Sequence, residues 1–279
     1  MANYTVQDIK DLRALTGAGM SDVKKALEEA DGNQQEAMKI IRERGLAKAA
    51  KREGNATSEG LVAVEVTDTA AGQAATLIEV NAETDFVVKN DKFIALAESI
   101  LAAAHAAGAT TVDEALAATI DGETVEAVIT AASGTMGEKI VLRRLARVEG
   151  PAITTYMHRT AKDLPPSIGV VVVTDAKAEP VAKDIAQHIA AMAPKYLTRE
   201  DVPADVLETE REIATKQTIA EGKPEKAIPK IVEGRLGGFF KENVVIEQPL
   251  AKDTKVTVKQ HVESTGGQLV EFARFRVGN

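Results

Sequence analysis

The chain has 279 residues, which is enough for about two domains of typical size. It carries 34 Lys and Arg against 42 Asp and Glu, a net charge of −8, and it has no cysteine. The acidic balance disfavours non-specific binding to nucleic acid, which needs clustered cations against the phosphates. The lack of cysteine excludes disulfides and thiolate-bound metals and fits a reducing compartment. Since no apolar run reaches the roughly 18 residues of a membrane span, we expect a cytoplasmic protein that does not enter a membrane.

The first 45 residues predict three short helices. Thr5 and Ser21 are placed to cap the first two, and Asn33 with Glu36 predicts a capping box at the start of the third. Gly45 predicts the end of the third helix. Because helices this short are not stable alone, we expect them to pack together as a small domain.

A change of composition over residues 46–60, where basic and small residues mix, indicates a linker; a solvated extension of the third helix is the alternative. Two runs rich in β-branched residues, 61–66 and 76–80, flank a turn around Gly72 and predict a hairpin. We therefore expect a second, mixed domain to begin near residue 61.

The order strand, strand, helix then occurs twice. After the hairpin the patterns predict a polar loop over 81–86, a helix over 90–107, helical segments near 113–118 and 123–132, and a strand over 140–148. The second set has strands over 153–158 and 168–174 and an Ala-rich helix over 179–192. The phrases Leu96–Leu101 and Ile185–Ala190 align, which favours a duplicated subdomain, with coincidence as the alternative.

A pair of charged amphipathic helices is predicted over 201–242, with Gly222-Lys223-Pro224 between them. This pattern is typical of an antiparallel hairpin that protrudes or packs on a partner subunit. Residues 255–258 and 269–277 alternate and predict strands that close the chain.

No motif for catalysis or nucleotide binding is present. The segment 134–139 comes nearest to a phosphate-binding loop, but its spacing is wrong and Ile140 follows where Ser or Thr is needed. A guanine-reading Asn-Lys-x-Asp motif is missing, and the four histidines are scattered. We therefore expect neither an enzyme, nor a GTP-binding protein, nor a metal site.

Two features of the sequence are candidates for a functional role. The segment Glu83–Val87 places Phe86 next to an acid where a strand ends and a helix has not begun, and loop positions of this kind often carry function. The alternative is that Phe86 is a core residue packed under the next helix. His188 lies in an apolar stretch, and there the alternative is a buried histidine with both nitrogens satisfied.

Several blocks match, in order, those of one known family. They are Leu12–Met20 with Lys24–Leu27, Asn81–Val87, Gly137–Lys139 with Arg143 and Arg144, His188–Ala191, and Gly222–Pro224 with Val232–Arg235. On these blocks the chain resembles bacterial elongation factor Ts over essentially its whole length.

The resemblance implies an α+β fold. A three-helix domain like a ubiquitin-associated (UBA) domain is expected over 1–53, and a core of two similar α/β subdomains over 54–148 and over 149–200 with 243–279. A helical coiled-coil hairpin over 201–242 is inserted in the second subdomain, and a short module ends the chain.

The resemblance also implies a function. The family contains guanine nucleotide exchange factors that release GDP from elongation factor Tu without covalent chemistry. GDP, GTP and magnesium belong to that partner, so no cofactor is expected on this chain, and no direct contact with nucleic acid. The helical hairpin is the candidate surface for pairing two copies.

The residues that match partner contacts of the family lie in several parts of the chain. They are Arg13, Met20, Thr84, Asp85, Phe86, Val87, Met136, Gly137 and His188. Phe86 would be the wedge that intrudes into the partner, and Asp85 would disturb its magnesium site or the surrounding waters.

Two other classes of function stay open at this point. An adaptor would use the three-helix domain to bind a partner without changing nucleotide release. A hydrolase or transferase would need a nucleophile motif, which is missing. Measuring GDP release from elongation factor Tu separates all three.

Overall fold

The computed structural model describes residues 3–278, in which helices and strands are interspersed. The helices are α1 (Val6–Thr16), α2 (Met20–Glu29), α3 (Gln34–Ala50), α4 (Asp85–Val88), α5 (Asp91–Ala106), α6 (Val112–Ala117), α7 (Val125–Met136), α8 (Glu179–Met192), α9 (Ala204–Ala220), α10 (Ile228–Asn243) and α11 (Val258–Glu263). The strands are β1 (Glu59–Thr69), β2 (Gly72–Ala82), β3 (Thr119–Ile120), β4 (Glu123–Thr124), β5 (Val141–Gly150), β6 (Ala152–His158), β7 (Ile168–Thr174), β8 (Pro249–Leu250), β9 (Asp253–Thr257) and β10 (Leu269–Arg276). Short 3-10 turns are η1 (Arg199–Asp201), η2 (Glu225–Ala227) and η3 (Val245–Glu247).

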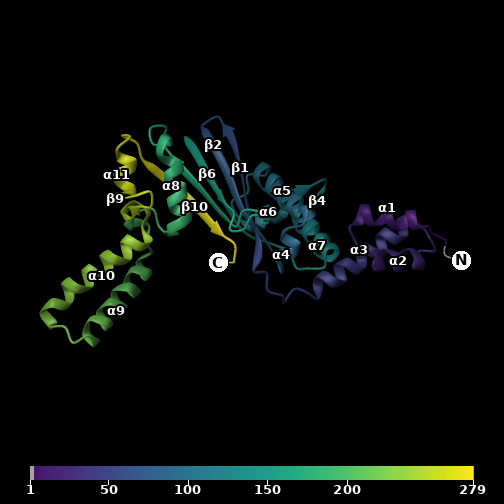
Figure 1. The fold of residues 1–279 in the computed structure, drawn as a ribbon, viewed down its shortest axis with the longest axis horizontal. Coiled ribbons are helices and arrows are strands. Elements are labelled where there is room, and N and C mark those ends of the chain that lie inside the picture. Colours follow the sequence, from purple (N-terminus) through teal and green to yellow (C-terminus); the bar gives the residue numbers. More distant parts are fainter. Residues whose placement is uncertain (1–2, 279) are drawn as a thin grey trace.

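Three helices, α1 to α3, form a unit at one end of the molecule (Figure 1). The predicted cap at Thr5 is confirmed and forms a capping box with Asp8. The cap predicted at Ser21 is wrong: the N-cap of α2 is Gly19, two residues earlier, and the helix begins at Met20. Asn33 accepts from the backbone of the following turn as predicted, but Glu36 returns no bond, so there is no capping box.

Helix α3 continues through Gly45 to Ala50, so the predicted stop is wrong. Gly45 instead faces Gly134 of α7, and a Cβ built on Gly134 would lie 2.4 Å from the Gly45 carbonyl. The two glycines therefore permit a close helix crossing that joins the three-helix unit to the core. Residues 46–50 of the predicted linker belong to this helix, as the alternative allowed, whereas residues 51–58 connect the helix to the core without helix or strand, and β1 begins at Glu59.

Two antiparallel sheets of three strands make up the core, and they share one topology. The orders are β1-β2-β5 and β10-β7-β6. In each sheet a hairpin is followed by helices, and a later strand then pairs with the second strand of the hairpin. The predicted hairpin around Gly72 and the predicted duplication are confirmed. The border expected after residue 148 falls inside β5, which ends at Gly150.

The sheets pack face to face, with helices on both outer faces. Along β2, Leu77 joins the cluster between the sheets, whereas Ile78 joins the cluster under α5 and α7. Along β7, Val171 points between the sheets and Val172 toward α8. This alternation is the period of two expected for strands buried on both faces, and it gives four layers, α/β/β/α.

Arg144 links the two sheets at one edge. Glu79 of β2 has a fully buried side chain and is bound by the guanidinium of Arg144 on β5, whose Nε lies 2.7 Å from Oε2. The same guanidinium donates to the carbonyl of Arg276 on β10 at 2.8 Å and lies 4.7 Å from the Phe275 ring centroid.

Helices α9 and α10 form the predicted antiparallel hairpin, which projects from the core at the end opposite α1 (Figure 1). Its base is held by a cluster that includes Val232, Leu236 and Phe240. Helix α11 was not predicted: the alternation seen at 255–258 stops at the end of β9, where Thr257 caps α11. Within residues 3–278, no helix has the length and hydropathy needed to cross a membrane.

Candidate functional site

The segment predicted as a loop over 81–86 is more ordered than expected. Strand β2 runs to Ala82, and Asp85–Val88 form the single helical turn α4. Successive residues of a helix point about 100° apart, so this turn has an inner and an outer side. Val88 is buried and Val87 packs against the core, whereas Phe86 is 81% exposed. Phe86 is therefore not the core residue that composition alone left open.

Glu138 ties the start of this turn to the end of α7. Its carboxylate accepts the backbone N–H of Thr84 at 3.0 Å and the Thr84 hydroxyl at 2.5 Å. Thr84 is the N-cap residue of α4, so these bonds hold the first residue of the turn. Both partners are half-buried, which makes the contact stronger than a fully solvated one.

Glu83 makes the reciprocal contact. Its carboxylate accepts the backbone N–H of Lys139 at 2.6 Å, the amide of Asn55 at 2.9 Å and the guanidinium of Arg52 at 3.3 Å. These donors, the Lys139 N–H above all, hold the pKa of Glu83 below its usual value. Glu83 and Glu138 together hold the connection between β2 and α4 against the segment that follows α7.

Next to Phe86, the ammonium of Lys89 is shared by two carboxylates. Lys89 Nζ lies 2.9 Å from Asp85 Oδ2 and 2.9 Å from Asp163 Oδ2, and 6.0 Å from the centroid of the Phe86 ring. The carboxylates of Asp85 and Asp163 raise the pKa of Lys89, and Lys89 in turn lowers the pKa of Asp163. Asp163 belongs to the loop between β6 and β7, and nothing in the local sequence pointed to it.

Met136 and Gly137 end α7 beside this segment. Gly137 adopts a left-handed conformation, with φ 77°, which turns the chain so that Glu138 and Lys139 follow directly. Met136 is half-buried and packs against the core under α5 and α7. The partner contacts predicted for both stay predictions.

Arg13 and Met20 lie in the three-helix unit, apart from α4. Arg13 is exposed on α1, and Met20, the first residue of α2, is 59% exposed. Leu15 of α1 is also exposed, at 72%. This unit thus presents apolar side chains to solvent independently of Phe86.

His188 is buried, with 1% of its surface exposed. Its Nδ1 accepts the backbone N–H of Ala251 at 3.0 Å, so Nε2 carries the proton that it donates to Gln248 Oε1 at 2.8 Å. Burial lowers the pKa of this imidazole, which favours the neutral form. The predicted partner contact of His188 stays a prediction, and in this structure the ring itself is covered and holds the segment around Ala251 to α8.

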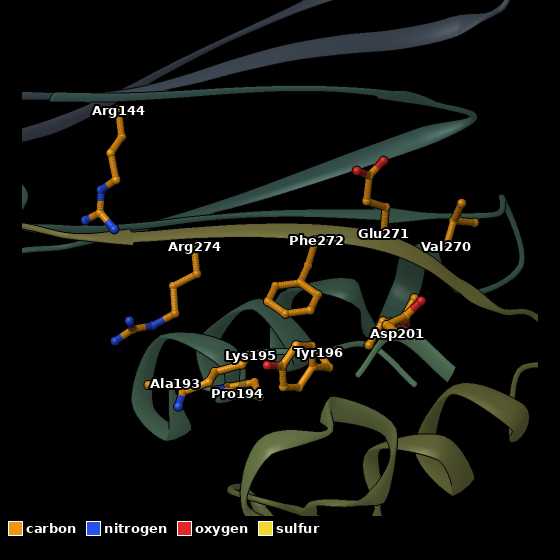
Figure 2. A pocket seen from close by; sticks show the side chains of 11 residues that line it. Arg144, Ala193, Pro194, Lys195, Tyr196, Asp201, Val270, Glu271, Phe272 and Arg274 are labelled. Carbon is orange, nitrogen blue, oxygen red and sulfur yellow. The ribbon is translucent and has the colours of Figure 1, made fainter. Parts of the chain in front are cut away.

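A cavity of about 740 Å³ lies between β10 and the segment that leads into the α9–α10 hairpin. Figure 2 shows the side chains of Arg144, Arg274 and Lys195 at one end of it, with Phe272 and Tyr196 in the middle. Burial, and then the neighbouring arginines, lower the pKa of Arg274. None of the predicted site residues lines this cavity.

The residues around Phe86 place its exposed ring and the carboxylate of Asp85 on an anchored turn. Among residues 3–278, no group of three or more His, Asp or Glu side chains is placed to hold a metal ion. The geometry suits contact with another macromolecule.

Comparison with known proteins identifies the family. The family model described as Elongation factor TS matches residues 83–279. The elongation factor Ts of Beutenbergia cavernae is 58% identical over 280 residues, that of Micrococcus luteus 55% over 282, and that of Renibacterium salmoninarum 53% over 281, each covering 100% of both chains. The chain therefore belongs to the elongation factor Ts family.

Proposed function

We propose that this protein binds elongation factor Tu in its GDP-bound form and promotes release of GDP, so that GTP can bind. Membership of the elongation factor Ts family supports this assignment. GDP, GTP and magnesium are held by the partner, and no covalent bond changes on this chain.

The observation that carries the proposal is Phe86, a large apolar side chain that is 81% exposed on an anchored turn. Burying a Phe side chain is worth roughly 1.5–3 kcal/mol, which a partner gains when it covers the ring. Because Thr84 and Glu83 already hold the turn in place, little conformational entropy is lost on binding. The ring therefore acts as a preformed wedge.

A wedge of this kind can weaken GDP binding without chemistry. Magnesium requires near-ideal octahedral coordination, so small displacements near the ion cost much nucleotide affinity. Phe86 would displace backbone near the nucleotide, and Asp85 would disturb the magnesium site or its waters. By linkage, the factor and the nucleotide then weaken each other's binding to the partner by the same ratio.

The other predicted residues would enlarge the contact. Arg13 and Met20 of the three-helix unit would bind a second area of the partner, and Met136 and Gly137 would border the wedge. On the helical hairpin, Ile213 is 42% and Ile219 is 58% exposed, so this hairpin remains the candidate surface for pairing two copies.

The test is stopped-flow release of fluorescent GDP from elongation factor Tu. Phe86→Ala should lower the maximal stimulated rate by about 10–150-fold, the rate equivalent of roughly 1.5–3 kcal/mol. Val270→Ala on β10, which is 43% exposed and lies outside the proposed partner contacts, is the matched control and should leave the rate unchanged. Equal rates for Phe86→Ala and the unaltered protein would refute the wedge, and binding without any stimulation would indicate an adaptor instead.

A further inference from the structure

The loop between β6 and β7 belongs to the second sheet, but it contacts the segment of α4, which follows the first sheet's strand β2. At its tip, Asp163 lies 2.9 Å from Lys89 Nζ, which is also 2.9 Å from Asp85. One cation is thus shared by two carboxylates that come from different halves of the core.

This loop is held in place by contacts of its own. Leu164 packs against the core beneath α4, and the carbonyl of Pro166 accepts the N–H of Val62 at 2.9 Å. The Thr160 and Ser167 hydroxyls, on either side of the tip, lie 3.0 Å apart within hydrogen-bond distance. Asp163 is therefore presented to Lys89 from a supported loop.

The sharing matters because Asp85 is not free in the unbound protein. If Asp85 turns toward a partner, Lys89 loses one of its two anions at the moment when the interface removes water from around it. A cation left without a counter-ion in such a place is costly. Asp163 supplies the second anion, so Lys89 stays paired while Asp85 leaves.

We propose that Asp163 is a positioning residue for nucleotide exchange. It keeps the Lys89 ammonium paired and in place when Asp85 leaves Lys89 to contact the partner. The proposal rests on the proposed function above and deepens it, because it assigns a role to a residue outside the Asp85–Phe86 turn. Asp163 acts through Lys89 and needs no contact with the nucleotide or the magnesium ion.

A double-mutant cycle in the same stopped-flow assay tests the proposal. Asp163→Asn should slow maximal stimulated GDP release by about two- to fivefold, the range expected for an exposed ion pair. In a Lys89→Met background the same substitution should change nothing, because the cation that it serves is gone. Asp163→Glu should restore the rate, and Glu263→Gln, which breaks the exposed pair between Glu263 and Lys259 on α11, is the matched control.

A second measurement is independent of exchange. Asp85 and Asp163 together raise the pKa of Lys89. Asp163→Asn should therefore lower the pKa of the Lys89 ammonium in an NMR titration of the free protein. An unchanged Lys89 pKa, an unchanged rate for Asp163→Asn, or an equal effect in both backgrounds would each overturn the proposal. If the unaltered protein itself failed to stimulate GDP release, the proposed function would fall, and this role with it.

Discussion

The contact between Glu138 and Thr84 offers a direct test of how rigidly the Phe86 turn is held. Glu138→Ala removes the acceptor of two hydrogen bonds, from the Thr84 N–H at 3.0 Å and from its hydroxyl at 2.5 Å. Hydrogen bonds to charged groups contribute about 1.5–3 kcal/mol each. Both donors are half-buried and can reach water once the carboxylate is gone, so we expect the loss of about one such bond in total.

The assay is native-state hydrogen exchange at the Thr84 amide, which reports local opening. A loss of about 1.5–3 kcal/mol in opening free energy means roughly 10–150-fold faster exchange, because every 1.4 kcal/mol is a factor of ten. Glu138→Gln keeps one acceptor oxygen and should give a smaller effect. The amide of Thr198, which donates to the Asp201 carboxylate at 2.8 Å in a distant turn, serves as the internal control.

The same substitution should also lower the maximal rate of stimulated GDP release, because a mobile turn no longer holds Phe86 in one orientation. If the Thr84 amide in Glu138→Ala kept the protection of the unaltered protein, this reasoning about the anchored turn would be refuted.

Two further predictions concern packing and pH. Gly134→Ala should separate α3 from α7, because the new Cβ would lie 2.4 Å from the Gly45 backbone, and limited proteolysis of residues 51–58 should then become faster. The control is Gly45→Ala, whose Cβ meets only ordinary contacts at 3.5 Å, and this variant should be cleaved like the unaltered protein. Equal proteolysis of the two variants would contradict the crossing. Burial lowers the pKa of His188 below 6.5, so on acidification below that value the unfolded chain takes up a proton that the folded protein does not. The free energy of unfolding should therefore rise with pH across this window. His188→Gln should remove this part of the pH dependence when denaturant unfolding is measured at several pH values. An unchanged pH dependence in His188→Gln would contradict the role given to His188.

Much of the secondary structure was predictable because its signals are local. The cap at Thr5, the turn around Gly72 and the helical spacing after Asn90 all involve residues within a few positions of one another. One failure has a tertiary cause. Gly45 is typical of a helix stop when only its local sequence is considered, whereas in the structure it lies inside α3 and faces Gly134, which is far along the chain.

The candidate site divides in the same way. Its residue types and order, from Glu83 to Val87, were enough to indicate the family and the segment to examine. The sequence alone could not decide whether Phe86 is buried or exposed, because exposure depends on which distant elements cover a residue. Tertiary structure decided this: Val87 and Val88 turn inward, Glu138 and Asp163 arrive from other parts of the fold, and Phe86 is left facing solvent.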